Sequence, residues 1–262
     1  MTRLLFNAIA ASALTASSVT AIAADSSTAS DWDLKAFKGS LTANVAFTTD
    51  YRFRGISQTD RDFAVQGGFD YAMDSGFYLG TWASNVDNFN PNPYNGDNGA
   101  QAEVDLYGGY GTALSDQLSF DFNVLYYYYP GASTAGPNPE IDFWEFTPSV
   151  TYAEDNLSAT LGLSYSGDYY GESGDSFYPK FGFSSQLNNW LTFGGHVGYQ
   201  VVDDNDAWGT PDYLDWSLSL ATDQFGLNWK VAYIDTDLSG GDCFGGANTC
   251  GATVVGTISK SF

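Results

Sequence analysis

The most constraining feature of this sequence is a strict alternation of apolar and polar residues over long runs. The run that begins at Leu118 places apolar side chains on one face and Ser119, Asp121 and Asn123 on the other. A period of two is the period of a β-strand. These runs last about ten to thirteen residues, whereas a globular strand has about 5–6 and a tilted strand that crosses a bilayer needs about 9–11. The alternation therefore predicts strands that are long enough to cross a membrane.

Counting the alternating runs predicts about twelve strands. They begin near residues 40, 62, 76, 101, 117, 141, 157, 177, 190, 212, 225 and 251. Short turns at 74–76, 115–117, 154–156, 188–189 and 223–224 alternate with longer connections at 54–62, 87–100, 130–140, 167–176, 203–211 and 236–250. Transmembrane barrels have short periplasmic turns and longer outer loops. The sequence therefore predicts an all-β fold, a transmembrane antiparallel up-and-down β-barrel.

The chain divides into three expected segments. Residues 1–23 have the features of a secretory signal peptide, because Arg3 precedes an apolar run that ends in the small-x-small pattern Ala21-Ile22-Ala23. The alternative is a buried N-terminal helix. We expect cleavage after about Ala23, a periplasmic N-terminal segment over residues 24–38, and the barrel over residues 39–262. The expected location is the bacterial outer membrane.

The composition excludes several classes of protein. The chain has 31 acidic and 9 basic residues and a formal net charge of −22, which is too acidic for a nucleic-acid-binding protein. Aromatic residues make up 17% and hydrophobic residues 44%, the opposite of a disordered composition. No segment after the signal offers the roughly 20 apolar residues of a membrane helix. What remains is a secreted β-protein with an aromatic core or an outer-membrane barrel, and the strand lengths favour the barrel.

Four consecutive tyrosines, Tyr126 to Tyr129, end at Pro130-Gly131. If this strand runs outward, Tyr126 and Tyr128 face the lipid headgroups, and Tyr127 and Tyr129 face the mouth of the barrel. Aromatic girdles flank the apolar band of such barrels. The predicted girdle consists of Tyr126, Tyr128, Trp82, Trp144, Trp216 and Trp229.

The charged residues of the strands fall on the polar face by alternation, which predicts that they line the lumen. A Lys or Arg that faces lipid at mid-bilayer costs about 2–4 kcal/mol. The predicted lumen residues are Arg52, Asp70, Glu103, Asp105, Asp121, Lys180, His196, Asp215 and Lys230. The excess of carboxylates would concentrate cations in the lumen, so a slight cation preference is expected.

Three arginines argue against the expected cation preference. Arg52, Arg54 and Arg61 cluster near the outer end of the first predicted strand, which runs from Leu41 to Tyr51. They either hold an anionic solute or pair with carboxylates, and the acidic excess favours pairing. Small residues on the polar face, such as Gly109 and Gly198, either leave water-filled space or ease strand curvature. About twelve strands leave a narrow lumen at most, because barrels of about eight strands are filled by side chains.

Several stretches resemble the proteobacterial porin family labelled TorF. They are Thr49–Thr59 (Thr-Asp-Tyr-Arg-Phe-Arg-Gly-Ile-Ser-Gln-Thr), Ala64–Tyr71, Gly76–Val86, Glu103–Tyr110 and Tyr126–Gly131. The resemblance is specific through about residue 131 and looser afterwards. It implies an outer-membrane β-barrel and does not supply a transported solute.

The expected function is a porin-like passive diffusion channel for small hydrophilic solutes or ions. One alternative is a structural or adhesive barrel without conductance, in which acidic loops such as Asp203–Asp206 bind Ca²⁺ or Mg²⁺; that segment lacks the rest of a calcium loop. The other is an outer-membrane hydrolase, which would depend on His196, the one histidine of the chain. No Gly-x-Ser-x-Gly elbow is present, so we expect no enzyme, no cofactor and no metal site.

The last part of the chain carries two further signals. Cys243 and Cys250 are close in the sequence, and in an oxidising compartment they are expected to form a local disulfide rather than a metal site. The terminal Phe262 resembles the signal by which outer-membrane barrels bind the barrel-assembly machinery. Outer-membrane lipid and lipopolysaccharide are the other expected partners, no nucleic acid is expected, and a homo-oligomer is as compatible with the sequence as a monomer.

Overall fold

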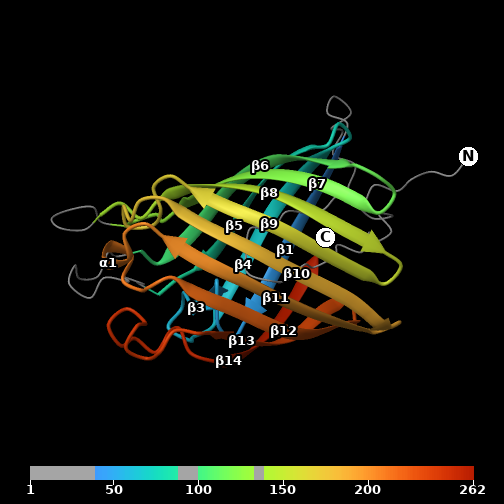
Figure 1. The fold of residues 1–262 in the computed structure, drawn as a ribbon. Coiled ribbons are helices and arrows are strands. Elements are labelled where there is room, and N and C mark those ends of the chain that lie inside the picture. Colours follow the sequence, from blue (N-terminus) through green and yellow to red (C-terminus); the bar gives the residue numbers. More distant parts are fainter. Residues whose placement is uncertain (1–38, 88–99, 133–138) are drawn as a thin grey trace, which may run out of the picture.

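The computed structural model describes residues 39–87, 100–132 and 139–262. Within these residues, twelve long antiparallel strands form one closed barrel (Figure 1). The strands are β1 (Gly39–Thr48), β4 (Ala64–Met73), β5 (Phe77–Asn85), β6 (Ala102–Ala113), β7 (Leu118–Tyr128), β8 (Phe143–Glu154), β9 (Leu157–Ser166), β10 (Ser176–Asn188), β11 (Leu191–Val202), β12 (Tyr213–Gln224), β13 (Leu227–Thr236) and β14 (Thr253–Ser261). The predicted all-β barrel of about twelve strands is confirmed. The expected signal peptide and periplasmic segment, residues 1–23 and 24–38, lie outside the described residues.

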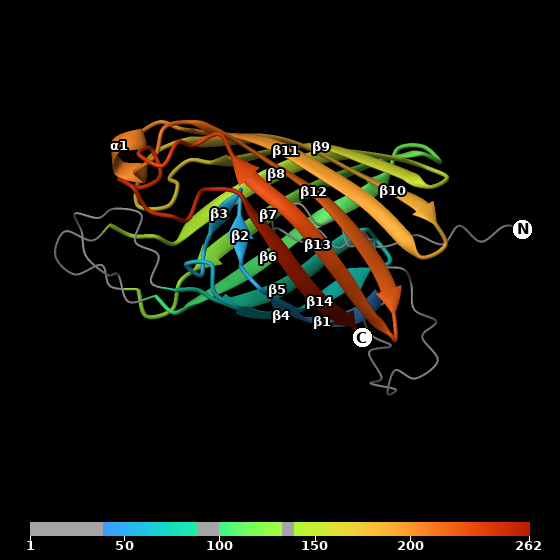
Figure 2. The same cartoon turned by 90° about the horizontal axis from the view of Figure 1, so that it is seen from below.

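Each long strand pairs with the next one along the chain, and β1 closes the ring by pairing with both β4 and β14. The β1–β4 register holds ten residue pairs, from Gly39↔Met73 to Thr48↔Ala64. The β1–β14 register holds five, from Asn44↔Ser261 to Thr48↔Thr257. Figure 2 shows β14 beside β1 along this closing seam.

The two faces of the wall differ sharply in polarity. Phe69 and Leu161 point outward and are 59% and 64% exposed, whereas their neighbours Asp70 and Gly162 point inward. Large apolar side chains are usually buried in soluble proteins, so this outer surface is suited to hydrocarbon rather than to water. No helix in the described ranges is long and apolar enough to cross a membrane.

Short turns lie at one end of the barrel and the longer connections at the other, as predicted. One short helix, α1 (Asn205–Trp208), belongs to the long-loop end. Several predicted boundaries are shifted by one or more residues. The turn between β12 and β13 is Phe225-Gly226, because Asp223 and Gln224 still pair with β13. The first strand ends at Thr48 rather than Tyr51, because the chain then leaves the wall.

Inward-facing glycines make room for tyrosine rings. A Cβ atom added to Gly198 would lie 2.2 Å from Tyr178 Oη, and one added to Gly109 would lie 2.4 Å from Tyr78 Oη. A ring packed over a glycine of the neighbouring strand fills the space and stabilises the sheet. At these two positions the space is therefore filled by protein, and the water-filled gap considered from the sequence does not form.

Candidate functional site

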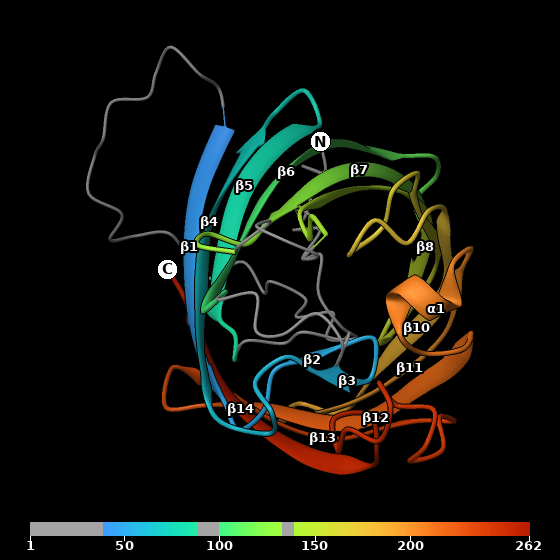
Figure 3. The same ribbon diagram turned by 90° about the vertical axis from the view of Figure 1, so that its left-hand side faces the viewer.

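The segment between β1 and β4 folds into the barrel instead of extending away from it. Within this segment, which we call the plug hairpin (residues 49–61), β2 (Arg52–Phe53) pairs with β3 (Ile56–Ser57). Figure 3, viewed into the long-loop end, shows both short strands inside the ring of the wall. Ile56 and Ser57 are almost completely buried. The plug hairpin therefore narrows the lumen near this end.

The tip of the plug hairpin is a two-residue turn, Arg54-Gly55. Both residues have positive φ, 47° and 79°, as a type I′ turn requires. A Cβ on Gly55 would lie only 2.5 Å from Thr236 Cγ2 on the barrel wall. Glycine is needed here both for the backbone conformation and for the close approach to the wall.

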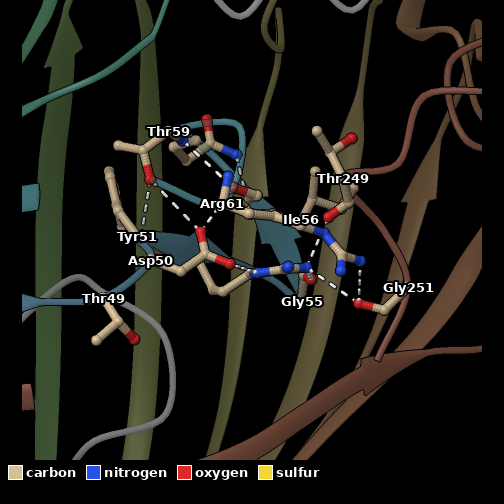
Figure 4. Close-up of polar contacts among 12 residues, drawn as sticks. Thr49, Asp50, Tyr51, Gly55, Ile56, Thr59, Arg61, Thr249 and Gly251 are labelled. Carbon is tan, nitrogen blue, oxygen red and sulfur yellow. Dashed lines mark hydrogen bonds and ion pairs between the residues drawn. The ribbon is translucent and has the colours of Figure 1, made fainter. Parts of the chain in front are cut away.

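Asp50 organises the inside of the plug hairpin. Its Oδ2 accepts a hydrogen bond of 2.6 Å from Arg52 Nε, and its Oδ1 accepts one of 2.6 Å from Ser57 Oγ. Figure 4 shows Asp50 at the centre of these contacts. Burial lowers the pKa of Arg52 and the neighbouring Asp50 carboxylate opposes that effect. The predicted lumen residue Arg52 thus lies in the lumen, but on the plug hairpin rather than on the first wall strand, because that strand ends earlier.

The base of the plug hairpin is docked on the connection between β13 and β14 (residues 237–252), which we call the cysteine loop. Cys243 and Cys250 form a disulfide with a Cα–Cα distance of 5.9 Å. Thr249 O accepts hydrogen bonds from Ser57 N at 2.9 Å and from Arg52 Nη1 at 2.6 Å. Arg61 donates to Asn248 O and Gly251 O, and the last of these contacts appears in Figure 4. Arg61 is therefore engaged by backbone carbonyls rather than by a carboxylate.

Arg54, at the tip, reaches across to the wall. Its Nη2 pairs with Glu145 Oε1 on β8, and its Nη1 donates to Gln200 Oε1 on β11. Burial alone would lower the pKa of Arg54, but the Glu145 carboxylate outweighs it and the pKa is raised. Sequence reasoning did not single out Glu145, although its position between outward-facing Trp144 and Phe146 places it on the inner face.

Glu103 links the plug hairpin to the opposite part of the wall. Its two carboxylate oxygens accept hydrogen bonds from Tyr51 Oη at 2.6 Å and from Tyr129 Oη at 2.7 Å. Because a buried carboxylate is costly unless it is hydrogen-bonded, these two phenols stabilise Glu103 inside the lumen.

Asp105 also points inward and is completely buried. Neither of its carboxylate oxygens has a hydrogen-bond partner among the described residues. Its cross-strand neighbours are Trp82 and Tyr127. The girdle prediction for Trp82 is therefore wrong, because the register places this ring on the inner face. There it packs edge-on against Tyr51, with 5.5 Å between the ring centroids.

Two further predicted carboxylates lie inside the wall of β4 to β7. Asp70 accepts a hydrogen bond from Tyr107, and Asp121 accepts one of 3.0 Å from Tyr78. Tyrosine hydroxyls therefore hold carboxylates in place along this side of the lumen.

The other side of the lumen carries the predicted basic residues and the histidine. Lys180 Nζ lies 3.4 Å from Ser164 Oγ, and Lys230 points inward from β13. His196 Nε2 lies 2.8 Å from Tyr178 Oη and 3.3 Å from Asp215 Oδ1. The structure brings His196 and Asp215 together through Tyr178. Lys180 lies near this group, because its register partner Gly198 also pairs with Asp215, whereas Lys230 lies on β13.

The remaining girdle residues lie on the outer surface. Tyr126, Tyr128 and Trp144 form an aromatic group at the long-loop end, with 4.6 Å between the ring centroids of Tyr126 and Trp144. Trp216 alternates with inward-facing Asp215 and Ser217. Trp229 lies near the short-turn end, where its Nε1 donates to Gln224 O at 3.3 Å. The outward aromatic residues thus lie toward both ends of the barrel.

Solved porin structures are similar in fold to this chain. One, described as a KdgM porin, is 8% identical, with 84% of this chain and 99% of that chain covered and a TM-score of 0.55. Another, described as a NanC porin, is 11% identical, with 84% and 98% covered and a TM-score of 0.53. At these identities the similarity establishes the barrel fold. No curated protein matches the chain.

A family model described as "Bacterial protein of unknown function (Gcw_chp)" matches residues 36–262, which include the whole barrel and the plug hairpin. The family label is Gcw_chp, so the TorF name to which the sequence motifs pointed is not confirmed. The chain belongs to the Gcw_chp family.

Proposed function

We propose that the protein is an outer-membrane, porin-like channel for passive diffusion of small hydrophilic solutes or ions, with a slight cation preference. The observation that carries the proposal is the closed twelve-stranded wall, apolar outside and polar inside. A closed barrel satisfies all backbone hydrogen bonds within the wall, which is what crossing hydrocarbon requires. The porin folds of similar shape support the same function.

The location and partners belong to the same proposal. Export would remove residues 1–23, and the strand that ends at Phe262 would engage the barrel-assembly machinery. The exposed apolar wall would contact outer-membrane lipid and lipopolysaccharide. Oligomerisation is tested by the mass of the detergent-solubilised particle.

The cation preference is supported by the inner surface. Carboxylates inside the barrel outnumber cationic side chains; they are Asp50, Asp70, Glu103, Asp105, Asp121, Glu145 and Asp215, against Lys180, Lys230, Arg52 and Arg54. Both arginines are already paired with carboxylates. The remaining excess of carboxylates supports a negative field in the lumen, which would favour cations.

Purified protein in a planar bilayer tests the proposal directly. We expect discrete conductance steps and, under a potassium chloride gradient, a reversal potential of the sign that cation selectivity gives. Clear anion selectivity would contradict the cation preference and leave the channel in place. Absence of conductance in both the wild type and a variant with a loosened plug hairpin would contradict the channel itself.

A second candidate, a structural barrel without conductance, is favoured by one observation. The long-loop end is filled by a cluster of buried side chains that includes Tyr127, Tyr129, Phe143, Tyr169 and Trp208. Conductance of the wild type separates the two candidates. The acidic segment 203–206 gives this candidate little support, because Asp204 caps α1 by accepting a hydrogen bond from Ala207 N at 2.9 Å.

We propose no enzymatic role. His196 is engaged by Tyr178 and Asp215, and its ring contacts are explained by this inner-face network. Ester hydrolysis that disappears in His196→Ala would contradict this view.

A further inference from the structure

We propose that the barrel wall contains a binding site for guanidinium groups, which the protein's own Arg54 occupies when the plug hairpin is docked, and that alkylguanidinium solutes bind there when the hairpin moves away. The inference rests on the proposed channel function and names one class of cation that the lumen would recognise.

Two acceptors on separate strands contact the two terminal nitrogens of Arg54. Glu145 Oε1 accepts from Nη2 and Gln200 Oε1 accepts from Nη1. Glu145 is 3% exposed and Gln200 is fully buried. A guanidinium group presents its donors in a fixed planar fork, whereas an ammonium group is a point charge with freely oriented donors. The placement of one acceptor opposite each terminal nitrogen therefore selects a guanidinium group.

Aromatic rings complete the site. The Arg54 Cζ atom lies 4.1 Å from the ring centroid of Tyr178 and 5.7 Å from that of Tyr169. Both distances are within the range of cation–π attraction. A third ring, Phe53 at 4.8 Å, belongs to the plug hairpin itself. The carboxylate, the amide and two of the rings therefore remain on the barrel and its loops when the hairpin leaves.

The wall holds these groups in place without help from Arg54. Glu145 Oε2 accepts a hydrogen bond of 3.1 Å from Tyr127 Oη, and Gln200 Nε2 donates one of 2.7 Å to Ser176 Oγ. Tyr178 Oη donates one of 2.7 Å to Asp215 Oδ2. Glu145, Gln200 and Tyr178 are thus each held by a side chain other than Arg54, so their positions do not depend on Arg54.

Loss of Arg54 would leave Glu145 buried without its cation. Breaking a buried ion pair by removing one partner is strongly destabilising. The charge of Lys180 also interacts with Glu145, but its amine donates to Ser164 Oγ and does not replace the Arg54 hydrogen bonds. A solute cation that restores both the charge and the hydrogen bonds should therefore bind. N-ethylguanidinium is the fragment that Arg54→Ala removes beyond Cβ, and it can restore the charge and both hydrogen bonds. Ammonium restores the charge alone, and tetramethylammonium has no donors.

The test is chemical rescue of full-length Arg54→Ala in detergent. We expect its thermal unfolding temperature to rise with the logarithm of N-ethylguanidinium concentration, as binding to the folded state requires. Equal concentrations of ammonium or tetramethylammonium chloride should give no comparable rise. The wild type should not respond, because its site is occupied. Arg54→Ala/Glu145→Gln should lose the response, and the matched control Arg54→Ala/Asp121→Asn should keep it.

Bilayer recordings separate this inference from the channel function. If Arg54→Ala conducts and N-ethylguanidinium neither blocks the current nor raises the unfolding temperature, the guanidinium site is disproved and the channel stands. If no variant conducts but N-ethylguanidinium stabilises Arg54→Ala, the site stands and the channel fails. Equal stabilisation of the wild type, or of Arg54→Ala/Glu145→Gln, also disproves the site.

Refolding yield gives the same test if Arg54→Ala does not fold in plain buffer. Recovery that requires N-ethylguanidinium supports the site. Recovery that is the same with ammonium chloride, or no recovery with either salt, overturns it.

Discussion

Tyr51 and Glu103 are 52 positions apart in the sequence, yet the Tyr51 hydroxyl group donates a hydrogen bond of 2.6 Å to Glu103 Oε1, and both side chains are buried. Burial raises the pKa of Tyr51, so the phenol keeps its proton and remains a donor. The contact joins the plug hairpin to β6 and fixes how deeply the hairpin lies in the lumen.

Tyr51→Phe should loosen the docked plug hairpin while its edge-on contact with Trp82 is kept. Loss of a hydrogen bond to a charged group costs about 1.5–3 kcal/mol. We expect amide hydrogen exchange in residues 49–61 to accelerate roughly tenfold or more, as measured by mass spectrometry. Tyr233→Phe is the matched control, because that hydroxyl bonds Asp235 on the exposed surface. Unchanged exchange in Tyr51→Phe would show that this contact does not hold the hairpin.

Asp50→Asn should have a larger effect than Tyr51→Phe. It leaves the buried Arg52 guanidinium group without its carboxylate, and breaking a buried ion pair costs about 3–5 kcal/mol. Exchange of the hairpin amides should accelerate further, and the bilayer current should become larger or noisier. Asp62→Asn, in the same connection but exposed, is the control. A current and an exchange pattern identical to wild type would contradict the role of Asp50.

Cys243→Ser/Cys250→Ser should free the loop on which the plug hairpin is docked. The disulfide restricts the loop that presents Thr249 O to Ser57 N and Arg52, and a disulfide typically stabilises by about 2–4 kcal/mol. We expect the hairpin amides to exchange faster while the amides of β7 to β11 do not change. Uniformly faster exchange over the whole barrel would instead show that the disulfide stabilises the wall.

Gly198→Ala should destabilise the barrel through Tyr178. The added Cβ would meet the phenol at 2.2 Å and displace it from His196 and Asp215. Overpacking of this kind costs about 1–3 kcal/mol, measurable as the free energy of unfolding in urea from detergent or lipid. In the control Gly182→Ala, the nearest atom to the added Cβ is 3.8 Å away. Equal losses in both variants would contradict the ring-over-glycine explanation.

Asp121→Asn and Lys180→Gln should shift ion selectivity in opposite directions. Both side chains point into the lumen from different parts of the wall. Removing the carboxylate should weaken the cation preference, and removing the amine should strengthen it. Reversal potentials in a salt gradient measure both shifts, and two shifts of the same sign would show that these charges do not face the conducting path.

The wall strands can be predicted from the sequence because the pattern that forms them, alternation of apolar and polar residues, is visible within each short segment. Alternation with a period of two places every strand start within about two residues of its observed position, and turn composition marks the connections. The same logic would have found Glu145, which alternates with Trp144 and Phe146. Alternation does not show where a strand leaves the wall, so it assigns Arg52 to the wall although Arg52 belongs to the plug hairpin.

The contacts inside the lumen were not predictable for a different reason. Arg54 and Glu145 are 91 positions apart, and no local pattern encodes their meeting. The preference of aromatic residues near strand ends for membrane interfaces predicts a lipid-facing Trp82, and this prediction is wrong. Alternation with outward-facing Phe77 and Leu79 places Trp82 on the inner face, and its register partners Gly68 and Asp105 agree.

The unequal pairing on the two edges of β1 determines where the barrel wall is easiest to open. With ten pairs toward β4 and five toward β14, the line between β1 and β14 is held by fewer ladder bonds than the line on the other edge of β1. A sideways split of the wall would begin along this line. We expect this line to close last during assembly, because one edge of β1 has no partner until β14 is in place.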